Sequence, residues 1–218
     1  MKSLPLEVVA SFLRLGRKYD IPLLLDEAIT RVTYEFPSTL VEFDGNEACA
    51  MIDASITMAI DITRLGRDNN LLSVVPSALF ICSIDSEFDV IFDGLIGSDG
   101  IRSTLSLDDQ RACILGWRRL IEMQREKTLA WMGPSPITNC TSPTRCSEKR
   151  SALRNVDQHL YPVPKFEALG PWDGTWTQGM CTVCEKNAKT SHQRGRKAVW
   201  NELPLVFGLA GWDELLKS

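Results

Sequence analysis

Apolar residues recur at helical spacing through the first 130 positions of this 218-residue chain, and this periodicity constrains the fold more than any other feature. The first stripe consists of Leu6, Val9, Ala10 and Leu13. A second stripe runs from Ile21 to Val32. Since residues three and four positions apart share one helix face, each stripe predicts an amphipathic helix. With Asp20 as N-cap of the second helix and Phe36-Pro37 as its end, residues 1–36 are predicted to form a helical hairpin.

The same pattern recurs fifty residues later. Residues 64–78 align with residues 14–28, and both copies contain the tetrapeptide Arg-Leu-Gly-Arg. The alignment places Gly16 and Gly66 at equivalent corners and predicts a second hairpin. Pro76 departs from the first copy and is expected to kink or delay the second helix. Two explanations stay open: true repetition, and the similarity that any two antiparallel helices with a glycine corner share.

A further helix is predicted from about Ser106 to Trp131, and it should be the longest in the chain. Ser106 and Asp109 have the spacing of a capping box, which satisfies free N–H groups at a helix start. Three glycines between Gly94 and Gly100 predict a loop before it. The first 130 residues show no alternation of period two, so any strand is expected to be a short hairpin in the tail.

The composition of the chain changes at Met132, where prolines, cysteines and tryptophans become frequent. Residues 1–130 hold 13 basic and 20 acidic residues, whereas residues 131–218 hold 11 basic and 8 acidic ones. The predicted fold class is all-α, with helical hairpins and a small irregular cysteine- and tryptophan-containing carboxy-terminal region. The predicted segments are a closing hairpin (1–36), a helical extension (37–131) and a tail module (132–218).

Four tail cysteines have the spacing of a metal site. Cys181 and Cys184 form a C-x2-C knuckle, and Cys140 and Cys146 form a looser C-x5-C pair. Four thiolates suit a tetrahedral structural zinc site, in which each pair of sulfurs lies roughly 3.8 Å apart. The residues after Cys184 are predicted to be helical, and a helix N-terminus favours the thiolate form. Ordinary unliganded cysteines are the main alternative, and a redox pair is a weaker one.

Other candidate residues receive less specific interpretations. His192 lies too far along the predicted helix from Cys184 to share a metal and is expected on the surface, while His159 is expected in a loop. The basic residues after the knuckle are expected to form a solvated helical face: Lys186, Lys189, Arg194, Arg196 and Lys197. The aromatic residues of the tail are expected to form its core: Trp172, Trp176, Trp200, Phe207 and Trp212.

Composition and missing motifs exclude several classes of protein. The net charge of −4 and the pI of about 5.3 argue against a protein that coats DNA. The sequence contains no P-loop, dinucleotide-binding fingerprint, zinc-protease motif or nucleophile elbow, so an enzyme of a common class is not expected. No secretory signal or membrane span is expected. With seven cysteines, an odd number, the reducing cytoplasm or nucleus is the expected location.

The segment Leu13-Arg14-Leu15-Gly16-Arg17-Lys18-Tyr19-Asp20-Ile21-Pro22 resembles the closing helices of BTB/POZ domains, where a lysine-tyrosine pair sits at the corner of the last hairpin. Later segments are similar to the carboxy-terminal region of BTB/POZ domain-containing proteins of mushroom-forming fungi. They are Asn70 to Leu79, Asp109 to Cys113, Cys181 to Cys184 with His192 and Gly195-Arg196, and Trp200 to Trp212. The strands and early helices of a BTB core do not occur in this sequence.

The resemblance implies a non-enzymatic protein-interaction module. BTB/POZ domains mediate dimerisation and partner docking, and some with a helical extension act as substrate adaptors of cullin ubiquitin ligases. Other proteins are therefore the expected partners. A zinc-dependent nucleic-acid-binding tail is the alternative from another class, and an unrecognised enzyme is a third.

Overall fold

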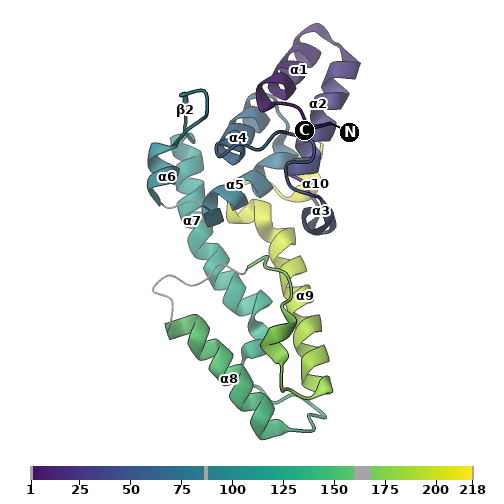
Figure 1. The fold of residues 1–218 in the computed structure, drawn as a ribbon, viewed down its shortest axis with the longest axis vertical. Helices are drawn as coiled ribbons and strands as arrows, with labels where there is room; N and C mark the ends of the chain where they lie inside the picture. The colour runs from purple at the N-terminus through teal and green to yellow at the C-terminus, as the bar shows by residue number, and fades with distance from the viewer. Residues whose placement is uncertain (1, 86–87, 160–167, 218) are drawn as a thin grey trace. The chain divides into compact units, whose positions relative to one another are not determined.

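A computed structural model describes residues 2–85, 88–159 and 168–217, and in them the chain is an all-α protein (Figure 1). It divides into two compact units. Unit 1 comprises residues 1–117 and 202–218, and unit 2 comprises residues 118–201. These units differ from the three segments predicted from the sequence, because two helices, at 107–123 and 182–206, each contribute to both units. The three predicted segments stay a prediction about domain organisation.

Unit 1 is built from short helices. They are α1 (Leu6–Tyr19), α2 (Pro22–Glu35), α3 (Leu40–Gly45), α4 (Met58–Asp68), α5 (Val75–Asp85), α6 (Phe88–Asp93), the first part of α7 (Leu107–Met123) and α10 (Trp212–Leu215). A 3-10 turn at Leu72–Val74 precedes α5. Its core contains aliphatic side chains from both predicted stripes, among them Val9, Leu13 and Val32, together with Ile62 and Leu65 of α4. Both stripes therefore contribute buried faces, except at Ile21, the first residue of the second stripe, which is 38% exposed.

The two predicted hairpin corners have the same geometry. The carbonyl of Gly16 accepts the N–H of Ile21 at 2.9 Å, and the carbonyl of Gly66 accepts the N–H of Leu71 at 2.8 Å. Asp20 and Asn70 both adopt the left-handed conformation, with φ of 53° and 50°. The equivalent corners are confirmed.

The two hairpins differ after the corner. The helix after Gly66 is delayed, since a 3-10 turn at Leu72–Val74 comes before α5, which begins one residue before Pro76. Asp20 ends α1 rather than capping α2, because its left-handed backbone closes the first helix and Ile21 takes the N-cap position.

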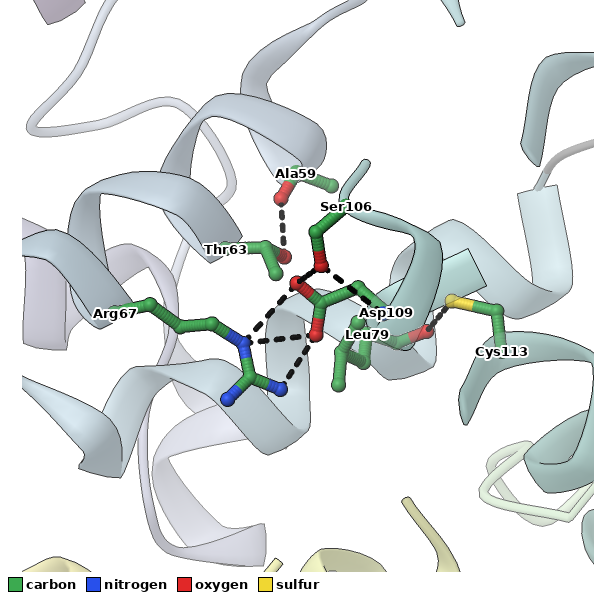
Figure 2. Close-up of polar contacts among 7 residues, drawn as sticks. All are labelled: Ala59, Thr63, Arg67, Leu79, Ser106, Asp109 and Cys113. Carbon is green, nitrogen blue, oxygen red and sulfur yellow. Dashed lines mark hydrogen bonds and ion pairs between the residues drawn. The ribbon is translucent and has the colours of Figure 1, made fainter. Parts of the chain in front are cut away.

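Polar side chains at the start of α7 form a cap with the predicted spacing, in which Ser106 accepts a backbone N–H as in a capping box (Figure 2). The N–H of Asp109 donates to Ser106 Oγ at 3.1 Å, and that hydroxyl donates to Asp109 Oδ2 at 2.7 Å. The guanidinium of Arg67 also donates through Nε to both carboxylate oxygens of Asp109, at 2.8 and 3.1 Å. Asp109 is only 2% exposed, whereas the side chain of Arg67 is 36% exposed, so this ion pair joins α4 to α7 at the edge of the interior of unit 1.

Two expectations about elements were wrong. The described strands, β1 (Leu95–Ile96) and β2 (Arg102–Ser103), form a hairpin in unit 1 rather than in the tail. β1 lies inside the segment between Gly94 and Gly100 that is predicted to be a loop, and only the part after Ile96, in which Gly100 has φ of +78°, forms the turn that leads to β2. The longest described helix is α9 (Thr182–Val206), with 25 residues, rather than the helix after Ser106. That helix, α7, ends at Met123, where a π-helical turn (Gln124–Thr128) and a 3-10 turn (Ala130–Met132) replace its last predicted turns.

Unit 2 contains α8 (Pro143–His159), most of α9 and a short 3-10 turn at Gly174–Thr177. Buried polar side chains hold the segment 168–170: Thr128 Oγ1 donates to the carbonyl of Ala168 at 2.6 Å, and Arg196 donates through Nε and Nη2 to that of Leu169 at 3.0 and 2.8 Å. No helix among the described residues is long and apolar enough to cross a membrane.

Candidate metal centre

The first pair of candidate ligands lies at the start of α8. Cys140 lies in the preceding loop, after Asn139, whose left-handed backbone (φ 62°) turns the chain. The N–H of Cys140 donates to the carbonyl of Ile137 at 3.2 Å. Cys146 lies in the first turn of α8, which begins at Pro143, a residue suited to that position because it has no N–H. The C-x5-C spacing thus spans a loop and a helix start.

The second pair lies at the start of α9. Cys181 directly precedes the helix, and its carbonyl accepts the N–H of Glu185 at 2.9 Å. Cys184 lies in the first helical turn, so the C-x2-C knuckle presents both thiols at one helix N-terminus. Gly179, with φ of +86°, makes the turn that leads into the knuckle.

The four sulfur atoms converge. Every Sγ atom of Cys140, Cys146, Cys181 and Cys184 lies within 4.8 Å of the others. The Sγ atoms of Cys140 and Cys181 are 3.7 Å apart. This distance is far longer than a disulfide bond, which is about 2.05 Å, and close to the roughly 3.8 Å expected across a tetrahedral metal–thiolate site. The four sulfur atoms therefore converge to within 4.8 Å, with one pair at the predicted spacing, and the four cysteines can bind a metal.

Hydrogen bonds and burial set the charge of the cluster. Hydrogen bonds from the backbone N–H groups of Cys184 and Thr141 lower the pKa of the Cys181 thiol to about 5, so it is a thiolate at neutral pH. The N–H of Cys181 in turn donates to Cys146 Sγ at 3.3 Å. Burial raises the pKa of Cys146 and of Cys184, and for Cys184 the neighbouring thiols raise it further. Hydrogen bonding therefore favours the thiolate form of Cys181, whereas burial favours the protonated form of Cys146 and Cys184, which would lose their protons on binding a cation.

Apolar side chains surround the sulfur atoms. Met180 is buried, Ile137 packs against the cluster, and Cys146 and Cys184 are each 1% exposed. Four protein ligands would complete a tetrahedral shell around one metal ion, which is the ligand count of structural sites.

Both histidines depart from their predictions. His192 is fully buried rather than on the surface, and its ring packs against those of Trp172 and Trp176 at centroid distances of 5.4 and 5.2 Å. Its Nε2 lies 3.0 Å from the carbonyl of Gly170, which can only accept, so this contact needs a proton on Nε2. His192 thus belongs to an aromatic cluster and not to the group of converging cysteines. His159 is the last residue of α8 rather than part of a loop; its side chain lies outside the described part of the chain.

The basic residues of α9 divide into two kinds. Lys186, Lys189, Arg194 and Lys197 are exposed, as expected for a solvated face. Arg196 is 7% exposed, because its guanidinium binds the carbonyl of Leu169. The expectation of a solvated face is therefore wrong for Arg196.

Sequence analysis missed a buried arginine beside the cluster. Arg150 lies one helical turn after Cys146 on α8, is 6% exposed, and lines a pocket together with Cys140, Cys146 and Cys184. The available signal was its spacing: position 150 shares a helix face with position 146.

No protein-family model, no curated protein and no solved structure matches this chain.

Proposed function

We propose that the chain is a non-enzymatic protein-interaction protein in which a structural zinc ion holds unit 2 together. The observation that carries this proposal is the convergence of four thiols from two helix starts, all within 4.8 Å of one another. The proposed ligands are Cys140, Cys146, Cys181 and Cys184. A site of this kind fits a protein of a reducing compartment, the cytoplasm or the nucleus, where thiols do not form disulfides.

Zinc suits these donors better than other common ions. Four sulfur ligands in tetrahedral arrangement select zinc or iron, whereas calcium and magnesium take oxygen ligands. Backbone N–H groups that donate to Cys181 and Cys146 spread the negative charge of a four-thiolate shell. Metal binding in a segment with few aliphatic core residues is coupled to its folding.

The interaction role rests on the resemblance to BTB/POZ proteins and on the character of the site. A four-ligand metal centre stabilises a surface and supplies no open position for a reaction. Within this proposal the chain acts as an adaptor that presents a partner protein to a cullin ubiquitin ligase. Nucleic-acid binding ranks below it, because Arg196 is buried against a backbone carbonyl and interrupts the basic run of α9.

Elemental analysis of the purified chain tests the metal. We expect about one zinc per chain and no iron, and we expect Cys184→Ser to lose it. Cys49→Ser is the matched control, because Cys49 lies outside the four-cysteine group and should keep the zinc. A wild-type protein without zinc, or a Cys49→Ser variant that loses it equally, would contradict the metal proposal.

Size-exclusion chromatography with a purified cullin tests the adaptor role separately. We expect co-elution of the zinc-loaded chain with the cullin. If the chain binds zinc but elutes alone, the adaptor role fails while the structural metal stands.

A further inference from the structure

Unit 2 contains a second feature, a pocket of about 620 Å³ between α8, α9 and the segment 130–138. Arg150 and Lys186 line it and are both basic, whereas no acidic residue is among its lining residues in the described part of the chain. Its volume lies within the range of small-ligand pockets. The pocket therefore combines a positive charge with enough room for an organic molecule.

Arg150 is the most informative residue of this pocket. Its Nη1 donates to the carbonyls of Gly133 and Ser135, both at 2.8 Å, which fixes the guanidinium against the loop. Its Nε is buried and has no hydrogen-bond partner among the described residues. None of the ion pairs among those residues includes Arg150. The described residues thus supply no carboxylate to Arg150, which is 6% exposed, and a buried cation without a counter-charge is costly unless an anion completes it.

Other lining residues complement this charge. Lys186 is exposed on α9 and brings a second cation to the pocket, while Thr190 and Ser191 offer hydroxyl donors from the next turn. Trp131 and Ile137 add apolar surface, and the buried Nε1 of Trp131 has no hydrogen-bond partner among the described residues. The lining suits a ligand with an anionic head and an apolar body.

We propose that this pocket binds a carboxylate or phosphate group attached to an apolar or aromatic body, with Arg150 and Lys186 as the residues that recognise the anion. The proposal goes beyond the metal centre and does not require it to carry zinc. A carboxylate and a phosphate each present a pair of oxygen atoms that a guanidinium can bind through two parallel hydrogen bonds. The experiment below distinguishes these two head groups.

Three small probes with one aromatic ring test the pocket: 3-phenylpropionate, phenyl phosphate and the neutral 3-phenylpropanamide. Each is titrated into the full zinc-supplied chain, and the indole N–H signal of Trp131 is followed by NMR. The signal is assigned by its loss in Trp131→Phe. We expect saturable shifts with at least one of the two anions and none with the amide, and the tighter anion identifies the head group.

Variants test the two cations. Lys186→Ala should weaken anion binding about three- to fivefold, as for an exposed charge, and Lys189→Ala should leave it unchanged. Lys189 is the matched control, because it is exposed on the same helix and does not line the pocket. Arg150→Gln should weaken binding at least about tenfold. Since Arg150 also fixes the loop at Gly133 and Ser135, Lys186→Ala keeps the test valid if Arg150→Gln fails to fold.

Several results would overturn the proposal. Equal binding of the neutral amide would show an apolar pocket without anion recognition. Equal losses in Lys186→Ala and Lys189→Ala would show general electrostatic attraction. If neither anion binds the wild-type chain and Arg150→Gln lowers the zinc content, Arg150 supports the metal centre alone. Anion binding by a chain that holds no zinc would support the pocket and contradict the proposed metal, so the two proposals fail separately.

Discussion

The two units of this chain are stabilised by different chemistry. Unit 1 has a core of buried aliphatic side chains, such as Leu13, Val32 and Ile62, that project from several short helices. In the described part of unit 2, one buried cluster consists of sulfur-containing residues, and another centres on Trp131, with Trp172 and Trp176 packed against it. Buried apolar side chains stabilise the folded state roughly in proportion to the area they remove from water. Four thiols stabilise it only when they bind a metal ion in the geometry that the ion requires. The units should therefore respond differently to the same kind of perturbation.

The largest expected effect comes from Cys184→Ser. Loss of one ligand should abolish metal binding and destabilise unit 2 by at least about 4 kcal/mol, because metal loss is among the strongest single-residue effects. Hydrogen exchange followed by mass spectrometry should show faster exchange in residues 118–201 and unchanged exchange in residues 1–117. Cys49→Ser should change neither. Faster exchange confined to unit 1 would contradict the assignment of the metal to unit 2.

Two glycine-to-alanine substitutions, one in each unit, test how each unit tolerates an added methyl group. A Cβ at Gly16 would lie 2.7 Å from the backbone N of Leu25, and one at Gly195 would collide with the backbone of Lys127 and Thr128. Because backbone cannot move aside easily, each Ala variant should lose about 3 kcal/mol, Gly16→Ala in unit 1 and Gly195→Ala in unit 2.

Gly45→Ala is the matched control for these variants, since a Cβ there meets no atom within 4 Å. Its stability in urea should be unchanged or slightly raised. If exchange speeds up throughout the chain in either variant, the two units unfold together and the comparison fails.

Alkaline pH should weaken unit 1 through its buried thiols. Burial raises the pKa of Cys113 to about 11 from an ordinary value of 9.0. Below pH 9 the folded and unfolded states both hold the proton; between pH 9 and 11 the unfolded chain releases it first, so stability falls by about 2–3 kcal/mol. Urea midpoints measured from pH 8 to 10.5 should fall less steeply for Cys113→Ala than for wild type. If the urea midpoints of the two proteins fall equally with pH, the Cys113 thiol is not the group whose titration weakens unit 1.

The smallest expected effect is at the start of α7. Ser106→Ala removes the hydroxyl that accepts the N–H of Asp109, and we expect a loss of about 1 kcal/mol in urea unfolding. Ser106→Thr keeps a capping hydroxyl and should retain most of the wild-type stability. Losses of the same size in both variants would show that packing, and not the cap, stabilises this helix start.

The sequence by itself determined the features that depend on local spacing. The stripes of Leu6 to Leu13 and Ile21 to Val32 predicted two helices and, except for Ile21, their buried faces, because the helical period can be read from local spacing. The C-x2-C knuckle placed Cys181 and Cys184 at one helix start for the same reason. The corners at Gly16 and Gly66 followed from the shared tetrapeptide.

Only the tertiary structure decided which polar residues are buried and what they bind. Arg196 contacts Leu169, His192 contacts Gly170, and Arg150 contacts Gly133 and Ser135, all partners between 15 and 27 positions away. The local sequence around an arginine or histidine on an amphipathic helix does not indicate such a partner, because the burial of that residue depends on where a distant loop packs. The convergence of Cys140 and Cys146 with the knuckle has the same cause: their distance to Cys181 and Cys184 is set by how the start of α8 packs near the start of α9 within unit 2.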